Sequence, residues 1–430
     1  MMKKKINIIT LGCSKNVVDS EKLARQLLAH GYSVIYDSEV FTDIVIINTC
    51  GFINDAKEES IDTILSAIHA KNSGKVKKVY VIGCLSERYA ADLRKEIPEV
   101  DTYFGKNGFT EILSELHLEL RNELLNERLL STPKHLAYLK IAEGCDRTCA
   151  FCAIPLITGS YRSASIENLV AEANSLGKNG AKELILIAQD LSYYGIDQTK
   201  KSQLDALLRE LVKVQNIDWL RLQYIYPNNF PLEVLNLMAE NEKLCHYLDI
   251  PFQHITDNML MKMKRNFTQK ETHSLIDKIK NKIPDIALRT TLMVGHPGET
   301  EKDFDELLQF VKDAQFDRLG VFTYSHEEKT YAEKHYKDDI PEKIKQERAD
   351  EIMKVQESIM IKKQEKLIGT TQKVIIDREE DEGLFIGRSQ YDSYEVDTEI
   401  IIESDNVKVG EFYTVKIEKL EQYDLKASLI

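Results

Sequence analysis

The stretch that decides the fold is Lys140-Ile-Ala-Glu-Gly-Cys145-Asp-Arg-Thr-Cys149-Ala-Phe-Cys152, in which three cysteines have C-x3-C-x2-C spacing. It follows an apolar run, Tyr138 to Ile141, so we expect the three thiols in one tight loop after a strand. Three thiolates can hold three irons of a [4Fe-4S] cube, whose fourth iron then needs another ligand. A zinc knuckle usually takes four ligands in C-x2-C pairs, and no fourth Cys or His lies in this loop. The spacing therefore favours an iron–sulfur cluster over a zinc knuckle or three unrelated cysteines.

This spacing, with an aromatic residue directly before the third cysteine, resembles the signature of the radical SAM superfamily. Phe151 occupies the aromatic place. The resemblance implies that S-adenosylmethionine ligates the fourth iron through its amino and carboxylate groups, and that an electron from the cluster splits it to a 5′-deoxyadenosyl radical. Phe151 is then expected to pack beside the adenine or the cluster, with a plain core role as the alternative.

The bulk properties describe a globular protein of two to four domains: 430 residues, 43% hydrophobic and 30% charged. No apolar run approaches the roughly 20 residues that span a bilayer, and the N-terminal apolar run is too short for a signal peptide. We therefore expect a cytoplasmic protein without membrane association. Seven cysteines, an odd number, suggest metal or redox chemistry rather than disulfides. The net charge of −13 argues against broad binding of nucleic-acid phosphates and suits a basic protein partner.

Residues 4 to about 120 alternate strand-like and helical segments, which predicts an α/β domain with a parallel sheet and helices on both faces. A helix is expected from about Glu21 to His30, capped by Asp19-Ser20. The three predicted strands each lead to a cysteine, in the segments Leu11-Gly-Cys13, Asn48-Thr-Cys50 and Ile82-Gly-Cys84.

The carboxyl ends of parallel strands meet at one edge of a sheet, where ligands bind. We therefore expect Cys13, Cys50 and Cys84 to converge there and to hold a second cluster through three thiolates. The alternative is that each is a small buried residue, since free cysteine is among the most buried types.

The rest of the chain predicts two further domains. Residues 121–134 are interpreted as a helical linker. Strand candidates at 138–142, 183–189, 219–225, 247–252, 287–294 and 318–324 alternate with helices and indicate a partial (βα)6 barrel. One long helix is expected from Pro341 to about Ile368, and four β-prone runs after it predict a small antiparallel barrel of the OB kind. The predicted domains are 4–120, 131–365 (which includes the bridging helix) and 366–430.

This three-part order resembles the methylthiotransferases, radical SAM enzymes with an N-terminal cluster domain and a C-terminal TRAM domain, over nearly the whole chain. One branch modifies an adenosine of tRNA, and the RimO-type branch modifies an aspartate of ribosomal protein uS12. The stretches that resemble the RimO type are Leu11-Gly-Cys-Ser-Lys-Asn-Val-Val-Asp-Ser-Glu21, Leu139-Lys-Ile-Ala-Glu-Gly-Cys-Asp146, Ile187-Ala-Gln-Asp190 with Tyr193-Tyr-Gly195, and Tyr247-Leu-Asp-Ile-Pro-Phe-Gln-His254.

Two positions depart from the family pattern. The usual Gly-Phe-Pro-Gly-Glu reads Gly295-His-Pro-Gly-Glu299 here, and Lys329 stands where a Tyr-Ser-x-Glu-Glu-Gly-Thr stretch has glycine. Both positions are expected near the rim of the cofactor site, and neither is a predicted cluster ligand.

Charge separates the two branches independently of the motifs. Residues 366–430 contain 8 Lys or Arg and 15 Asp or Glu, a balance of 8 − 15 = −7. An RNA-binding OB domain normally offers a cationic groove, so direct RNA binding is expected to be weak or absent. An acidic barrel would attract a ribosomal protein rich in lysine and arginine, although an acidic surface also simply aids solubility.

The resemblance implies methylthiolation of the β-carbon of a uS12 aspartate by two [4Fe-4S] clusters and S-adenosylmethionine. Cys145, Cys149 and Cys152 would hold the radical-generating cluster, and the other trio an auxiliary cluster that carries the sulfur. The sequence indicates neither the electron donor nor the sulfur source. A tRNA adenosine methylthiotransferase and a non-catalytic iron–sulfur sensor are the alternatives.

Three single residues outside the two cysteine trios remain to be interpreted. Gln189, at the end of the second barrel strand, could accept a hydrogen bond from the S-adenosylmethionine amino group, or be an ordinary strand-end amide. Cys245 is interpreted as a core residue before an apolar strand. His254 is interpreted as structural and is assigned no catalytic role.

Overall fold

The computed structural model describes residues 4–40 and 42–430. They form two compact units. The first is the chain up to Thr132 with Tyr138–Arg147 and Ala153–Leu176, and the second is Pro133–Ala137, Thr148–Cys152 and Gly177–Ile430. Within the described ranges, no helix has the length and apolar character needed to cross a membrane.

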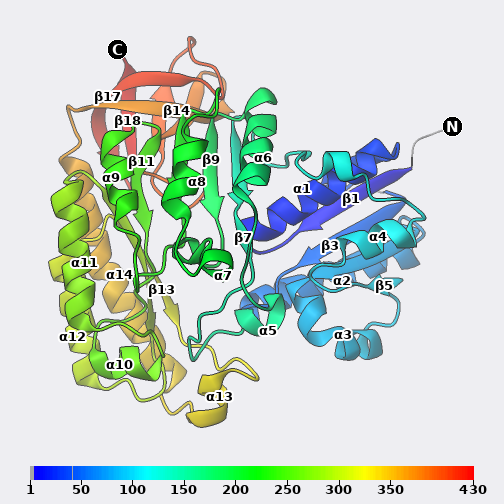
Figure 1. The fold of residues 1–430 in the computed structure, drawn as a ribbon, viewed down its shortest axis with the longest axis horizontal. Helices are drawn as coiled ribbons and strands as arrows, with labels where there is room; N and C mark the ends of the chain where they lie inside the picture. Colours follow the sequence, from blue (N-terminus) through cyan, green and yellow to red (C-terminus); the bar gives the residue numbers. More distant parts are fainter. Residues whose placement is uncertain (1–3, 41) are drawn as a thin grey trace. The chain divides into compact units, whose positions relative to one another are not determined.

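The first unit contains a five-stranded parallel sheet with the order β2-β1-β3-β4-β5 (Figure 1). Its strands are β1 (Lys5–Thr10), β2 (Ser33–Tyr36), β3 (Ile44–Thr49), β4 (Lys78–Gly83) and β5 (Thr102–Tyr103). Its helices are α1 (Ser14–Ala29), α2 (Asn54–Asn72), α3 (Cys84–Glu96) and α4 (Phe109–Glu115). Apolar side chains of α2 and α3 pack on one face of the sheet, and those of α1 and α4 on the other. The predicted parallel sheet with helices on both faces is confirmed; β2 and β5 were not predicted.

The predicted start of the first helix, at Glu21, is wrong. Helix α1 begins at Ser14, directly after the extended residue Cys13, whose carbonyl accepts from the N–H groups of Asn16 and Val17 at 2.9 and 3.3 Å. The backbone turn thus forms without a capping side chain, and the segment that was predicted as a cap lies inside the helix.

The helical linker predicted for residues 121–134 is also wrong. It contains only a 3-10 turn, Asn122–Leu124. Its backbone is held instead by side chains of α1: Gln26 exchanges two hydrogen bonds with the Arg121 backbone, and Glu21 accepts from the Ser131 N–H at 2.8 Å. These contacts replace the hydrogen bonds that a helix would make.

The next part of the chain, residues 133–178, consists of helices and strands that are joined by irregular loops. They are β6 (Leu136–Lys140), β7 (Ala142–Glu143), α5 (Ile154–Thr158), β8 (Arg162–Ser163) and α6 (Ile166–Lys178).

A second sheet has six strands in the order β13-β12-β11-β10-β9-β6, and the neighbours among β9 to β13 are parallel. Its further strands are β9 (Glu183–Ile187), β10 (Trp219–Leu222), β11 (Leu244–Asp249), β12 (Ala287–Val294) and β13 (Arg318–Thr323). Among and after them lie η2 (Leu191–Tyr193), α7 (Ile196–Thr199), α8 (Leu204–Leu211), α9 (Glu233–Glu240), α10 (Asp257–Lys262), α11 (Gln269–Lys282), α12 (Glu301–Ala314) and α13 (Tyr331–His335). Each of the six predicted strands exists, with ends shifted by a few residues.

A long helix and a closed barrel complete the second unit. Helix α14 (Glu342–Glu365) confirms the predicted long helix. The barrel order is β14-β15-β16-β18-β17, with β14 (Thr371–Asp381), β15 (Leu384–Ser389), β16 (Ile400–Glu403), β17 (Phe412–Glu421) and β18 (Asp424–Leu429). The barrel was predicted as antiparallel from four strands; its fifth strand, β18, lies parallel to β16 and closes it. Its interior is filled by apolar side chains from all five strands.

Candidate active site

Cys13, Cys50 and Cys84 lie at one edge of the first unit's sheet. The strands that precede them, β1, β3 and β4, are neighbours and run parallel, so their carboxyl ends share that edge. Cys13 caps α1, Cys50 directly follows β3, and Cys84 is the first residue of α3. The structure therefore brings together three thiols that are far apart in sequence, as predicted.

Two glycines allow this close approach. A Cβ on Gly12, whose φ of +88° already disfavours other residues, would lie 2.6 Å from the Cys50 Cβ and 2.8 Å from its Sγ. A Cβ on Gly51 would lie 2.7 Å from the Leu85 backbone and 2.9 Å from the carbonyl carbon of Cys84. The loops after the three strands are therefore packed backbone to backbone around the thiols.

The surroundings favour a negative charge at Cys13 but not at Cys50 or Cys84. Burial raises the pKa of Cys13, but Lys15, Lys106 and backbone N–H groups of the first turn more than offset it, so that its pKa is lowered. Burial raises the pKa of Cys50, and raises that of Cys84 to about 12. Because a coordinated metal displaces the proton of a thiol, these raised values do not prevent ligation.

In residues 4–40 and 42–430, no group of three His, Cys, Asp or Glu side chains is arranged to hold a single metal ion. Four thiolates around one zinc ion lie about 3.8 Å apart, from a Zn–S length of about 2.3 Å. A cube of four irons is larger than one ion and takes its ligands at separate corners. The donor set of the trio, three free thiols, is the kind that holds such a cube and leaves one iron open.

Cys145, Cys149 and Cys152 lie in the irregular loop between β7 and α5, and all three are partly exposed. Cys149 accepts a hydrogen bond from the guanidinium Nη1 of Arg265 at 3.2 Å. Arg265 is almost fully buried and stacks 4.2 Å from the centre of the Tyr226 ring. This guanidinium places a fixed positive charge and a hydrogen-bond donor beside the sulfur of Cys149.

Phe151 lies in a cluster of aromatic rings on the second unit. Its ring meets that of His296 edge to face, and His296 also contacts the rings of Tyr324 and Tyr336, at centroid distances of 5.0 and 5.8 Å. The aromatic residue of the cysteine loop therefore contacts the loop after β12, where the chain departs from the family pattern.

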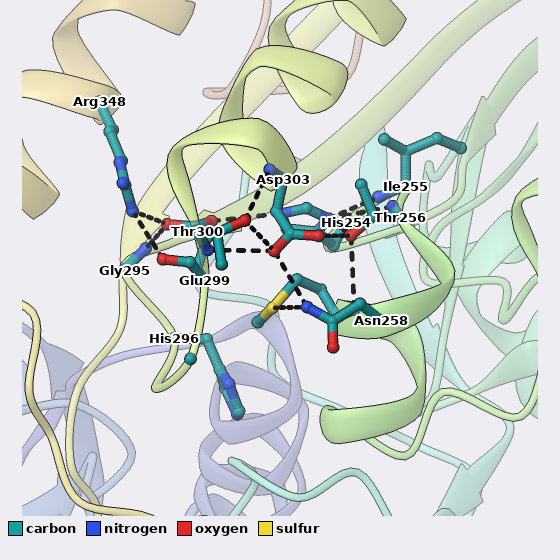
Figure 2. Close-up of polar contacts among 12 residues, drawn as sticks. His254, Ile255, Thr256, Asn258, Gly295, His296, Glu299, Thr300, Asp303 and Arg348 are labelled. Atoms are coloured by element: carbon teal, nitrogen blue, oxygen red, sulfur yellow. Dashed lines mark hydrogen bonds and ion pairs between the residues drawn. The ribbon is translucent and has the colours of Figure 1, made fainter.

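That loop is held by a buried carboxylate, Glu299. Its Oε2 accepts from the Gly295 N–H at 2.7 Å and from Nη1 of Arg348 at 2.6 Å, and its Oε1 lies 3.2 Å from Nε2 of His254. Figure 2 shows His296 on the same loop, with its ring directed away from this network. The network thus fixes the backbone that presents His296.

A second carboxylate, Asp303, extends the network. It accepts from the hydroxyls of Thr256 and Thr300 at 2.8 and 2.6 Å, and from the Asn258 amide at 2.9 Å (Figure 2). These bonds join the start of α10 to the start of α12 at the carboxyl ends of β11 and β12.

The remaining predicted residues are placed as follows. Gln189 lies two residues beyond β9 and is partly exposed. Cys245 is buried within β11, beside Trp219 and Tyr247, which confirms a core role. Nδ1 of His254 accepts from the Ile255 and Thr256 N–H groups at 2.9 and 3.2 Å, which confirms a structural role and assigns the ring proton to Nε2.

Two residues beside the thiols were missed by sequence reasoning. Arg265 follows residues 261–264, in which methionine and lysine alternate without forming a recognisable motif. Lys106 lies in a loop after the two-residue strand β5. Lys106, Asp19 and Lys140 are among the polar residues that line a cavity of about 340 Å³ in the first unit, together with apolar residues such as Ile46 and Leu169. No spacing signal connects these residues to a cysteine.

Three family models match the chain in order. Residues 5–105 match a model described as Uncharacterized protein family UPF0004, residues 139–311 match the Radical SAM superfamily, and residues 368–430 match the TRAM domain. Each match falls within one of the three predicted domains 4–120, 131–365 and 366–430.

Solved structures share the fold at low identity. The radical S-adenosylmethionine methyltransferase TsrM from Kitasatospora setae has a TM-score of 0.53 and 14% identity over 75% of each chain. The cobalamin-dependent S-adenosylmethionine radical enzyme OxsB has a TM-score of 0.51 and 12% identity over 82% of this chain and 56% of its own.

Curated relatives match from end to end. Proteins named ribosomal protein uS12 methylthiotransferase RimO are 51% identical in Porphyromonas gingivalis (100% of both chains) and 52% identical in Christiangramia forsetii (99% of this chain, 94% of the relative). The relative of that name in Bacteroides fragilis is 51% identical over 100% of both chains. Because such identity extends over all three parts, the chain belongs to the RimO family of methylthiotransferases, which are radical SAM proteins.

Proposed function

We propose that this protein methylthiolates the β-carbon of an aspartate in ribosomal protein uS12, with two [4Fe-4S] clusters and S-adenosylmethionine as cofactors. The observation that carries the proposal is the convergence of Cys13, Cys50 and Cys84 at one sheet edge in a chain that also has the radical SAM cysteine loop. Each trio supplies three ligands to a four-iron cube, so each would leave one iron open for another ligand. The family to which the chain belongs supports the same reading.

When bound, the clusters and S-adenosylmethionine would supply the radical and sulfur chemistry. The β-carbon of an aspartate has no readily acidic proton, so acid–base side chains would not suffice to activate it. Cys145, Cys149 and Cys152 would hold the cluster that acts with S-adenosylmethionine, and the sheet-edge trio the cluster that carries the sulfur.

The other residues of the site would position the cofactors and shield them from water. Arg265 orients the Cys149 thiol, and Glu299 fixes the loop that presents His296. The rings of Phe151 and Tyr324 form an apolar surround that would keep water from a reactive intermediate. Gln189 remains our candidate for a contact with the cofactor's amino group.

We assign uS12 as the partner on charge as well as on the family name. The barrel region 366–430 has a balance of 8 − 15 = −7, and its carboxylates at 379–382 are all exposed. A protein rich in lysine and arginine is attracted to such a surface, whereas a nucleic-acid backbone is repelled. The proposed place of action is accordingly the cytoplasm, with little direct RNA binding.

The test is an anaerobic assay of the reconstituted protein with S-adenosylmethionine, a reductant and sulfide, on a uS12 peptide that contains the aspartate and on tRNA. Mass spectrometry should find the methylthio group on the peptide only. Product on tRNA alone would assign the chain to the adenosine-modifying reaction, and release of no 5′-deoxyadenosine would favour a non-catalytic iron–sulfur protein.

A further inference from the structure

Lys106 is a buried lysine whose side chain is only 3% exposed. Its Nζ lies 2.9 Å from Oδ2 of Asp19 and 3.7 Å from Oε1 of Glu143. Burial lowers the pKa of Lys106, but the two carboxylates more than offset it, so that its pKa is raised and it stays charged. The residue is therefore a fixed positive charge inside the first unit.

Lys106 also joins the two helices that begin at the cysteines. Asp19 lies in the second turn of α1, which starts after Cys13. The Lys106 backbone N–H donates to Oε2 of Glu87 at 2.8 Å, and Glu87 lies in the first turn of α3, which starts at Cys84. One residue thus connects, through its backbone and its side chain, the elements that carry two of the three thiols.

The ammonium group lies beside the N-terminal turns of both helices. Its Nζ pairs with Asp19, six residues after Cys13, and the Lys106 backbone N–H is bonded to Glu87, three residues after Cys84. Lys140 shares Asp19 and Glu143 with Lys106, but within the residues that the structure describes it makes no bond to α3, the helix of Cys84. The two lysines of one ion-pair network therefore differ in their relation to the cysteines.

We propose that Lys106 is a positioning residue of the sheet-edge cluster, which holds the helices of Cys13 and Cys84 in place and raises the reduction potential of the cluster through its charge. This rests on the proposed function of the trio as a cluster site. A [4Fe-4S]2+ core with three thiolates carries about one net negative charge, and about two after it takes up one electron. A nearby cation stabilises the more negative, reduced form more strongly, because the Coulomb energy scales with the product of the charges.

The test uses the full chain with Cys145, Cys149 and Cys152 changed to Ala, so that one cluster site remains. An anaerobic redox titration followed by electron paramagnetic resonance gives the midpoint potential of that cluster. In this background Lys106→Met should shift the potential to more negative values, and Lys106→Arg, which keeps the charge, should stay close to the parent. Lys140→Met is the matched control, with the same loss of charge from the same network and a smaller shift.

A Lys106→Met potential equal to that of the parent or of Lys140→Met overturns the proposal. If Lys106→Met does not fold, Asp19→Asn carries the test, because it removes the negative charge that pairs with Lys106 and leaves the charge of the lysine unbalanced, which should shift the potential to more positive values. No shift, or a negative one, then overturns the role. If the parent binds no iron, the trio is not a cluster site and the proposed role of Lys106 is wrong as well. A normal cluster whose potential does not change in Lys106→Met is a different outcome, which rules out the role of Lys106 alone.

Discussion

The rings of Phe151 and His296 meet edge to face, with 6.5 Å between their centroids and 81° between their planes. His296 is completely buried, and its Nδ1 donates to the carbonyl of Pro297 at 3.2 Å. Its Nε2 has no hydrogen-bond partner within the residues that the structure describes. The chain therefore carries a buried, unpaired acceptor where the family pattern has phenylalanine.

This arrangement predicts a pH-dependent stability. Burial lowers the pKa of His296 to about 4. An unfolded histidine titrates near 6.5, so below that pH the unfolded chain takes up a proton that the folded one does not, and the free energy of unfolding falls. The loss from this group should be about 2 kcal/mol at pH 5 relative to pH 7.

His296→Phe should remove that loss and, by deleting the unpaired acceptor, raise the free energy of unfolding at pH 7 by about 1–2 kcal/mol. Trp219, the one tryptophan of the sequence, lies in the same unit and reports its urea unfolding by fluorescence. The exposed His273 of the same unit, changed to Gln, serves as control and should leave the pH dependence as it is. An equal pH dependence in the parent and His296→Phe would contradict the prediction.

Lys329 predicts a second gain in stability. It has a φ of +63° and is exposed, in the place where the family pattern has glycine. A left-handed conformation costs a non-glycine residue about 1–2 kcal/mol, part of which is offset by the greater backbone freedom of glycine in the unfolded chain. Lys329→Gly should therefore raise the free energy of unfolding by about 1 kcal/mol, again measured through Trp219.

The control for this change is Lys337→Gly. Lys337 is also exposed, but it does not have a positive φ, so glycine should lower the stability there by up to about 1 kcal/mol. The same sign of effect at both positions would argue against strain at Lys329.

Iron content tests the two trios separately. The reconstituted protein should hold about eight irons per chain, from the two proposed four-iron cubes. The triple change of Cys145, Cys149 and Cys152 to Ala should leave about four, as should the triple change of the other trio. Cys245→Ala, which alters a buried cysteine of β11 outside both trios, should keep about eight. Four irons in the unmodified protein would eliminate one site.

The sheet-edge variant should also separate the two reactions. With Cys13, Cys50 and Cys84 changed to Ala, the protein should still cleave S-adenosylmethionine but make no methylthio product. Normal product formation by this variant would refute the sulfur-carrier role of the trio.

Gly12→Ala tests the close packing around the trio. The new methyl group would lie 2.6 Å from the Cys50 Cβ, and at a φ of +88° it cannot be relieved cheaply. We expect loss of the iron of this site, which leaves about four of eight irons per chain. Gly74→Ala is a matched control with a φ of +77° and nothing within 4 Å of the added carbon. It should lose some stability but no iron, and iron loss in both variants would point to backbone strain rather than to crowding at Cys50.

Short sequence patterns were sufficient to predict the helices and strands whose residue types show a clear local periodicity. Strand-like runs such as Ile44–Thr49 alternate with helical segments, so the parallel sheet followed from the order of elements. Convergence of Cys13, Cys50 and Cys84 followed from that order too, because parallel neighbours end at one edge. The start of α1 could not be predicted in this way. The helix begins with a backbone turn at Cys13, although Asp19 and Ser20 are better capping residues.

Sequence by itself determined the cysteine spacing, the three-part order and the acidic barrel, because each is a property of residue types along the chain. Only the tertiary structure decided which side chains lie at the two cysteine sites: Lys106 joins the helices of Cys13 and Cys84, and Arg265 lies beside Cys149. Both are cations that come from loops far away in sequence, and their burial is favourable only where the fold supplies carboxylates or thiolates to pair with them. Such pairing depends on distances across the folded chain, which no local pattern encodes.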